Sequence, residues 1–110
     1  MNDCIFCKIA KGEFNTEFLY EDDFIVAFND INPQAPVHFL VVPKKHYSSL
    51  NELDDLDIIS KIFNAIKKVS EKLGIKDYRT VLNTGKKAGQ EVFHIHFHVM
   101  AGRDFSWPAG

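Results

Sequence analysis

The stretch His94-Ile95-His96-Phe97-His98-Val99-Met100 alternates imidazole and apolar side chains. In a β-strand, side chains two residues apart share a face, so the three histidines would point one way and the apolar residues the other. The apolar set can seat the strand on a core while the imidazoles face a cleft. Imidazole acts as nucleophile, acid, base or metal ligand near neutral pH. The pattern therefore predicts a half-buried strand that carries the functional site.

The rest of the chain predicts an antiparallel sheet with one main helix. Apolar residues from Leu53 to Leu73 recur at three- and four-residue steps, which indicates an amphipathic helix over 52–73 that stops at Gly74. The other expected elements are a helical turn at 4–10, a hairpin of strands 17–20 and 24–29 around the acidic turn 21–23, a loop at 30–36, a buried strand at 38–42 ended by Pro43, and strands 78–84 and 91–101 joined by the glycine-bounded basic loop 85–90.

This layout is an α+β fold in a single domain, residues 1–110, with the helix on one face of the sheet and the histidines on the other. The ten phenylalanines suggest a core or pocket built from aromatic rings. A net charge of −2 without a basic stripe argues against a nucleic-acid partner. The longest apolar runs are too short for a membrane span, and the first residues do not read as a secretory signal. A cytoplasmic location is expected.

The histidine row has three interpretations. As metal ligands, side chains two apart on a strand lie roughly 6.6 Å apart and those four apart about 13 Å, so two can share one ion but three cannot easily do so. As a solvated face, the row would carry no chemistry. Nucleophilic catalysis fits better, with neighbouring groups that orient one ring and stabilise charge on an attacked phosphorus.

The sequence resembles the histidine-triad (HIT) family, and in particular its Hint branch of nucleotide-binding hydrolases. Residues 94–100 match the family signature in full, and the resemblance covers nearly the whole chain. The further matching segments are Phe28 to His38, Val42-Pro43-Lys44-Lys45-His46, Gly89-Gln90-Glu91-Val92-Phe93 and Trp107-Pro108-Ala109-Gly110. The resemblance implies a HIT-like fold of five antiparallel strands with one long and one short helix, the sheet continuing across a homodimer.

The resemblance also implies a phosphoramidase mechanism on purine nucleoside 5′-phosphoramidates. His96 would attack the α-phosphorus and form a nucleotidyl-histidine intermediate, which water would hydrolyse to the nucleoside monophosphate. His98 would hydrogen-bond the phosphoryl group or the departing amine, and His38 would belong to the same imidazole network. The main-chain carbonyl of His94 would set the tautomer of His96. Imidazolium is an acid of suitable strength to protonate a leaving nitrogen.

The nucleotide site follows from the same resemblance. Asp30 would accept hydrogen bonds from the ribose hydroxyls, and Asn83 would lie near the phosphate and ribose. Gly89 and Gln90 can turn their backbone N–H groups toward a phosphate as a small anion nest; the alternative is a plain hairpin loop. The apolar base pocket would comprise Phe6, Phe28, Ile31 and Leu40.

Glu91 departs from the eukaryotic Hint pattern, which has a serine there whose hydroxyl contacts the phosphate. An ionised carboxylate cannot donate to a phosphoryl oxygen and repels it at close range. Two interpretations stay open. The side chain turns outward and only its N–H is used, or it binds a cationic leaving group such as a lysyl amine.

The pair Cys4-x-x-Cys7 forms a second constellation. Thiolates at this spacing can share one tetrahedral Zn²⁺, which two histidines would complete. Several proteins that this chain resembles carry structural zinc in this way, and the matching positions are Cys4, Cys7, His46 and His94. The alternatives are two reduced, partly buried cysteines, or a redox pair, which the absence of a β-α-β pattern disfavours.

Rival functions stay open at this level. One is a dinucleoside polyphosphate hydrolase of the same superfamily, which the short chain and the Trp-Pro ending disfavour. Another is a nucleotidyltransferase, a branch that typically replaces the third histidine, whereas His98 is present. A third is a non-catalytic nucleotide-binding or zinc-stabilised interaction module. Trp107 near the terminus supports the expected homodimer weakly, since an exposed Trp usually makes a contact.

Overall fold

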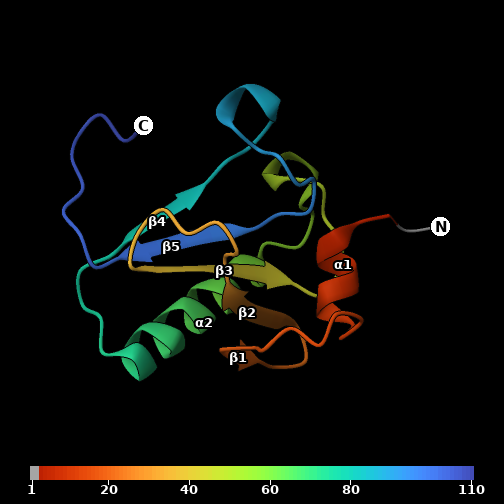
Figure 1. Ribbon diagram of the computed structural model, residues 1–110. Helices are drawn as coiled ribbons and strands as arrows, with labels where there is room; N and C mark the ends of the chain where they lie inside the picture. Colours follow the sequence, from red (N-terminus) through yellow and green to blue (C-terminus); the bar gives the residue numbers. More distant parts are fainter. Residues whose placement is uncertain (1–2) are drawn as a thin grey trace.

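The computed structural model describes residues 3–110, and over these residues the chain forms one five-stranded antiparallel sheet in the order β1-β2-β3-β5-β4. One long and one short α-helix accompany the sheet (Figure 1). The predicted fold class is confirmed. The elements in chain order are α1 (Ile5–Ala10), β1 (Tyr20–Glu21), β2 (Ile25–Asn29), β3 (Val37–Pro43), the 3₁₀ turn η1 (Leu50–Glu52), α2 (Asp57–Leu73), β4 (Arg79–Leu82), the 3₁₀ turn η2 (Lys86–Ala88) and β5 (Phe97–Ala101).

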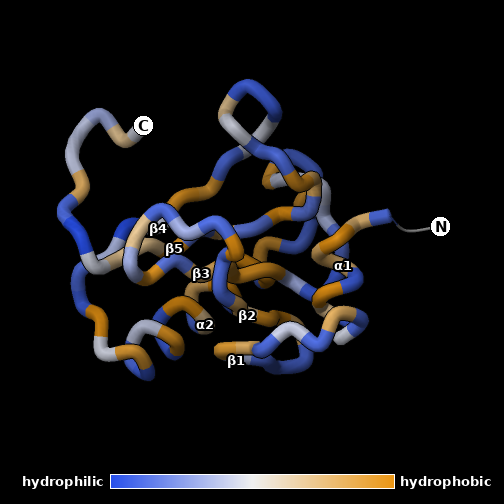
Figure 2. The backbone as a smooth tube through the Cα atoms, viewed as in Figure 1, coloured by the Kyte–Doolittle hydropathy of each residue, from blue (hydrophilic) through white to orange (hydrophobic). Residues whose placement is uncertain are grey.

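Helix α2 covers one face of the sheet. Hydrophobic residues alternate with hydrophilic ones along the helix (Figure 2), and its buried residues pack on the inward side chains of β2, β3 and β5. Ile95, Phe97 and Val99 belong to this cluster, as their alternation predicts. Burying one Ile, Val or Phe side chain contributes about 1.5–3 kcal/mol to the free energy of unfolding.

The opposite face of the sheet carries a smaller apolar cluster and the histidines. Phe6 from α1 packs there with Val26, Phe28, Leu40 and Val42. Its ring also stands edge-on to the rings of His94 and His96, with centroid distances of 6.0 and 5.0 Å. Helix α1 therefore closes the end of the sheet at which the histidine row begins.

The predicted strand 91–101 is too long, because β5 begins only at Phe97. The ladder with β3 runs from Val37–Ala101 to Val41–Phe97 and stops before Pro43. Pro43 has no N–H to donate, and its carbonyl accepts a hydrogen bond from Nε2–H of His94 at 2.7 Å. His94 and His96 thus lie in irregular backbone just before the strand.

The main helix begins at Asp57 rather than at residue 52. The Ser49 hydroxyl accepts from the Asn51 N–H and starts the separate turn η1, after which Leu53 is extended. The Asp55 carboxylate accepts from the Asp57 N–H at 3.0 Å and opens the helix proper. The predicted end is correct, since Gly74 adopts φ 71° and its N–H donates to Glu71 and Ser70 carbonyls.

Two further strands are shorter than predicted. The segment 17–20 joins the sheet only at Tyr20–Glu21, and 78–84 only at Arg79–Leu82. The acidic turn is ordered by Asp22, whose Oδ1 accepts from the N–H groups of Phe24 and Ile25 at 2.7 and 2.8 Å. Among the described residues, no helix is long and apolar enough to cross a bilayer.

Candidate functional site

His96 lies at the centre of the site with a defined tautomer. Its Nδ1–H donates to the main-chain carbonyl of His94 at 2.8 Å, the contact expected from the resemblance. Nε2 therefore carries the lone pair. Burial lowers the pKa of His96, and the hydrogen bond to His94 opposes this effect. The ring is therefore neutral near pH 7 and available as a nucleophile.

His38 and His98 form a hydrogen-bonded pair on the neighbouring strands β3 and β5. The Gln34 N–H donates to Nδ1 of His38 at 2.9 Å, so the hydrogen of a neutral His38 ring resides on Nε2. That Nε2 lies 2.9 Å from Nδ1 of His98 and 3.3 Å from Oδ2 of Asp30. His98 Nδ1 must accept, which leaves its hydrogen on Nε2.

The Asp30, His38 and His98 ligand atoms also lie close enough together for a metal ion. A metal would need the lone pair of His38 Nε2, which the Gln34 N–H on the other ring nitrogen disfavours. Their arrangement therefore fits a hydrogen-bond network better than a metal centre.

Burial also sets the charge of this pair. It lowers the pKa of His98 from 6.5 to about 4, and the rings of His96 and His38 add to the effect while Asp30 opposes it. Burial lowers the pKa of His38 too, against the field of Asp30. Without a ligand both rings are neutral at pH 7.

This depression predicts acid sensitivity. The unfolded chain protonates His98 near pH 6.5 and the folded chain only near pH 4, so its contribution is complete above pH 6.5 and is lost as pH falls toward 4. We expect this residue to lower the free energy of unfolding by a value on the order of 1–3 kcal/mol between these two pH values. Urea unfolding at pH 7.5, 6.0 and 5.0 measures it. His98→Asn is the matched control, and an equal pH slope in both proteins would contradict the assignment.

His38, His96 and His98 open onto a cavity of about 620 Å³ between α1, the loop after β2 and the segment before β5, whereas the buried His94 is outside its lining. This volume is within the usual range for small-molecule sites. Of the residues predicted to bind nucleotide, the lining includes Phe6, Phe28, Asp30, Ile31, Leu40, Asn83, Gly89, Glu91, His96 and His98, and also His38. Sequence reasoning missed Ile5, Ile9, Thr16, Asn29, Asn32, Gln34 and Val92. The i, i+4 spacing of Ile5 and Ile9 was a usable signal; Thr16 offers none.

The predicted anion nest is wrong. The N–H of Gly89 donates to the Lys86 carbonyl at 3.0 Å, and that of Gln90 to the Gly85 carbonyl at 3.1 Å. Gln90 is buried and outside the cavity lining. Its amide accepts from the Gly85 N–H and donates to the carbonyls of Ser48 and Val92. The Gln90 side chain therefore holds the loop in place. The N–H groups of Gly89 and Gln90 are used by the turns of the loop itself.

A Cys/His cluster lies at the N-terminal side of the site. The ligand atoms of Cys4, Cys7, His46 and His94 lie within 4.8 Å of one another. Nδ1 of His94 is 3.2 Å from both Cys4 Sγ and His46 Nδ1, and Cys7 Sγ is 3.4 Å from His46 Nδ1. Ligand atoms around tetrahedral Zn²⁺ lie roughly 3.3–3.8 Å apart. The Nε2–H of His94 donates to Pro43, which leaves Nδ1 as the lone-pair nitrogen. The residues fit the ion.

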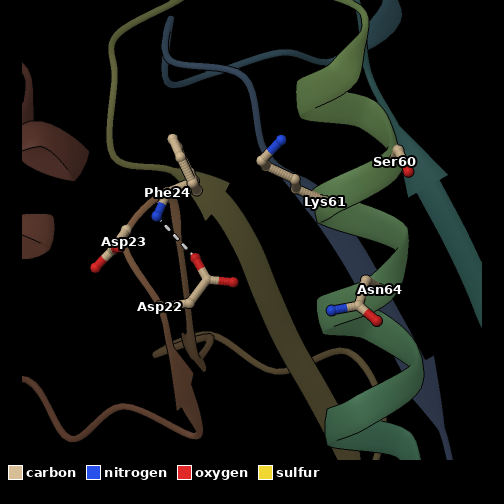
Figure 3. Close-up of a pocket in the computed structure, with 6 residues that line it drawn as sticks. All are labelled: Asp22, Asp23, Phe24, Ser60, Lys61 and Asn64. Atoms are coloured by element: carbon tan, nitrogen blue, oxygen red, sulfur yellow. Dashed lines mark hydrogen bonds between the residues drawn. The ribbon is translucent and has the colours of Figure 1, made fainter.

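A second hollow, of about 500 Å³, lies between the β1–β2 turn and α2 (Figure 3). Lys61 extends over the Phe24 ring, 4.8 Å from its centroid. Asp22 already accepts from Tyr20 and from two backbone N–H groups. The hollow contains no predicted functional residue, and its best-placed carboxylate serves the turn.

Comparison with known proteins agrees with this geometry. The family model described as the C-terminal binding part of the scavenger mRNA decapping enzyme matches residues 3–106. An uncharacterized HIT-like protein of Synechocystis is 45% identical, over 98% of this chain and 97% of its own length. Protein HitA of Neisseria gonorrhoeae is 43% identical, over 91% and 96%.

Solved structures of similar sequence have the same fold. A HIT family hydrolase from Legionella pneumophila superposes with a TM-score of 0.92 at 44% identity, covering 98% of this chain and all of that one. A histidine triad protein from Clostridium difficile gives 0.92 at 48% identity, over 96% of each chain. The chain therefore belongs to the histidine-triad family, and it is similar in fold to proteins named as HIT hydrolases.

Proposed function

We propose that the protein hydrolyses the P–N bond of purine nucleoside 5′-phosphoramidates, such as adenosine 5′-phosphoramidate or adenylyl-lysine. One observation carries the proposal: Nδ1–H of His96 is held by the His94 carbonyl, so a neutral nucleophilic Nε2 belongs to a ring that lines the cavity. A nitrogen nucleophile suits a phosphorus centre because it forms a reactive phosphoimidazole that water can hydrolyse.

In the proposed reaction, Nε2 of His96 attacks the α-phosphorus, the P–N bond breaks, and its electron pair stays on the departing nitrogen. That nitrogen leaves as an amine and takes its proton from solvent. Because Nδ1 of His98 accepts from His38, the Nε2–H of the neutral His98 ring can donate a hydrogen bond to a phosphoryl oxygen and stabilise the charge that develops there. Water then cleaves the nucleotidyl-histidine and releases the nucleoside monophosphate.

The cavity supplies groups for the rest of such a substrate. Phe6, Phe28 and Leu40 are buried around an apolar end that suits a purine ring, and the fully exposed Ile31 stands at its rim. The Asp30 carboxylate at the same wall suits ribose hydroxyls. Its Oδ1 already accepts from the Asn32 N–H at 2.8 Å, which holds the carboxylate in place.

A panel of substrates tests the proposal. Purified protein is offered adenosine 5′-phosphoramidate, adenylyl-lysine and a diadenosine polyphosphate, and AMP release is followed by chromatography. We expect the two phosphoramidates to be cleaved and the polyphosphate to be a poor substrate. Intact phosphoramidates would reject the proposal, and preferential polyphosphate cleavage would assign the chain to the rival hydrolase class.

Glu91 gives a prediction on the leaving group. It is exposed and lines the cavity, which favours contact with a cationic leaving group. We expect Glu91→Gln to raise KM for adenylyl-lysine by about threefold to fivefold, the worth of one exposed ion pair with the free α-ammonium group of the lysine, since the ε-nitrogen is uncharged while it is bonded to phosphorus. Adenosine 5′-phosphoramidate, which lacks the lysyl amine, is the matched control and should be unaffected. Equal changes for both substrates would contradict this role.

We further propose that Cys4, Cys7, His46 and His94 hold a structural Zn²⁺. The contact distances support it, and so does the hydrogen bond from Nε2–H of His94 to the Pro43 carbonyl, which leaves Nδ1 free to bind the ion. The ion would tie α1 to the backbone ahead of β5, and thereby hold Phe6 against His94 and His96.

A homodimer is proposed on the same footing. Strand β4 is an edge strand of the sheet, and Trp107 is 84% exposed. Both suit an interface in which the carboxyl terminus of one chain approaches its partner. Light scattering at working concentration tests this, and the mass of a single 12.6 kDa chain would reject it.

A further inference from the structure

Gln34 is an exposed residue of the loop 30–36, yet it makes contacts in two directions. Its N–H donates to Nδ1 of His38 at 2.9 Å. Its carbonyl accepts from Nε–H of Arg103 at 3.0 Å. A residue 69 positions away, on the turn after β5, therefore holds the residue whose N–H sets the tautomer of His38.

Arg103 is itself well restrained. Its guanidinium also donates to the Asp104 carbonyl at 3.0 Å and lies 4.2 Å from the Phe105 ring centroid. The preceding Gly102 has φ 96°, and a Cβ built there would lie 2.9 Å from Pro36. The turn after β5 thus meets the loop at two points, Gly102 on Pro36 and Arg103 on Gln34.

The hydrogen bonds from Gln34 to His38 and from His38 to His98 run in one direction, so each donor fixes the tautomer of the next ring. With the Gln34 N–H on Nδ1, His38 keeps its hydrogen on Nε2 and donates to His98. If the loop released that N–H, His38 could take the other tautomer. Its Nε2 lone pair would then face the Asp30 carboxylate, 3.3 Å away, and His98 would have to turn its own hydrogen to Nδ1. Nε2 of His98 would no longer be a donor.

We propose that Arg103 is a positioning residue that, by holding the Gln34 carbonyl, keeps His38 and His98 in their Nε2–H tautomers and so keeps His98 a donor toward the substrate. This rests on the proposed phosphoramidase function for its catalytic consequence. The tautomers themselves can be observed without any substrate.

Arg103→Met, which keeps the length of the side chain but has no donor, tests the proposal, with Arg79→Met as the matched control. Arg79 also lies over the Phe105 ring, at 5.0 Å, but its guanidinium donates to the Ser106 carbonyl instead of to Gln34. Both substitutions remove one charge from the same surface. Nitrogen-15 NMR of the histidine rings at pH 7.5 reports the tautomers, and steady-state kinetics with adenosine 5′-phosphoramidate separates kcat from KM.

For Arg103→Met we expect a second tautomer of His38 and His98 to appear and kcat to fall by about threefold to tenfold, the effect of one hydrogen bond, with KM nearly unchanged. Arg103→Gln keeps a side-chain N–H at the position of Nε and should stay closer to the parent, and Arg79→Met should match the parent. Unchanged tautomers in Arg103→Met would overturn the positioning role, whatever the kinetics. Altered tautomers with an unchanged kcat would overturn its link to catalysis. A parent protein inactive on phosphoramidates would instead reject the proposed function and leave the NMR test valid.

Discussion

Replacing His96 with alanine is expected to lower kcat/KM for adenosine 5′-phosphoramidate by at least about 10³-fold, since removing a nucleophile abolishes the covalent route. No second imidazole can substitute for it. Nδ1 of His98 accepts from His38, and the Nε2–H and Nδ1 of His94 face Pro43 and the cysteine cluster. AMP release by chromatography, with enzyme concentration raised for the variant, measures the loss.

Two controls separate a lost nucleophile from a lost fold. The affinity for AMP should change little in His96→Ala, because the apolar end of the cavity and Asp30 are untouched. His98→Asn should retain more activity than His96→Ala, with a loss of about 10²-fold, as expected for one hydrogen-bond donor to the developing charge. Parent protein incubated with radiolabelled substrate and then denatured in detergent at alkaline pH, where the P–N bond to imidazole survives, should carry label, and His96→Ala should not. Equal turnover by parent and His96→Ala would show that His96 is not the nucleophile.

Removing the proposed zinc ion is expected to have the second large effect, and on stability rather than chemistry. A ligand that binds only the folded chain, at a free concentration about a thousandfold above its Kd, contributes about 4 kcal/mol. For a domain of this size that corresponds to a Tm shift of about 15 °C or more. We expect a strong chelator to lower Tm by this amount and added Zn²⁺ to restore it.

Metal content and a matched variant complete this test. X-ray fluorescence of chelator-free protein should give one zinc per chain. Cys7→Ser should lose the metal and its sensitivity to chelator, while His98→Asn, a histidine outside the cluster, should keep both. Folded, active parent protein that contains no metal would reject the zinc site.

Most of the fold could be predicted from the sequence because helices and strands follow the periodicity of the apolar residues. Ile95, Phe97 and Val99 alternate, and all three pack under α2. Gly74 marked the end of that helix because a left-handed residue there favours glycine. The start of β5 could not be predicted in the same way. It depends on Pro43, whose missing N–H and occupied carbonyl stop the ladder from a position more than fifty residues away.

The candidate site divides in the same manner. The imidazoles and Asp30 could be named from their residue types and from the family resemblance. The hydrogen bonds that engage the N–H groups of Gly89 and Gln90 could not be predicted, because a loop sequence does not show which of its N–H groups donate to its own carbonyls. Arg103 and the backbone of Gln34 were also missed, since their roles arise from contacts between the loop 30–36 and the turn after β5.

The main-chain carbonyl of His94 orients the neighbouring ring of His96. Any side chain at this position would leave a carbonyl for Nδ1–H of His96, so alanine scanning is blind to that contribution and reports only on the ring. A backbone amide-to-ester replacement between residues 94 and 95 weakens this carbonyl as an acceptor, although it also removes the N–H with which Ile95 donates to the Tyr47 carbonyl at 2.7 Å. A second ester that removes only a backbone N–H elsewhere in the fold is therefore the control that exposes the part of the carbonyl in orienting the nucleophile.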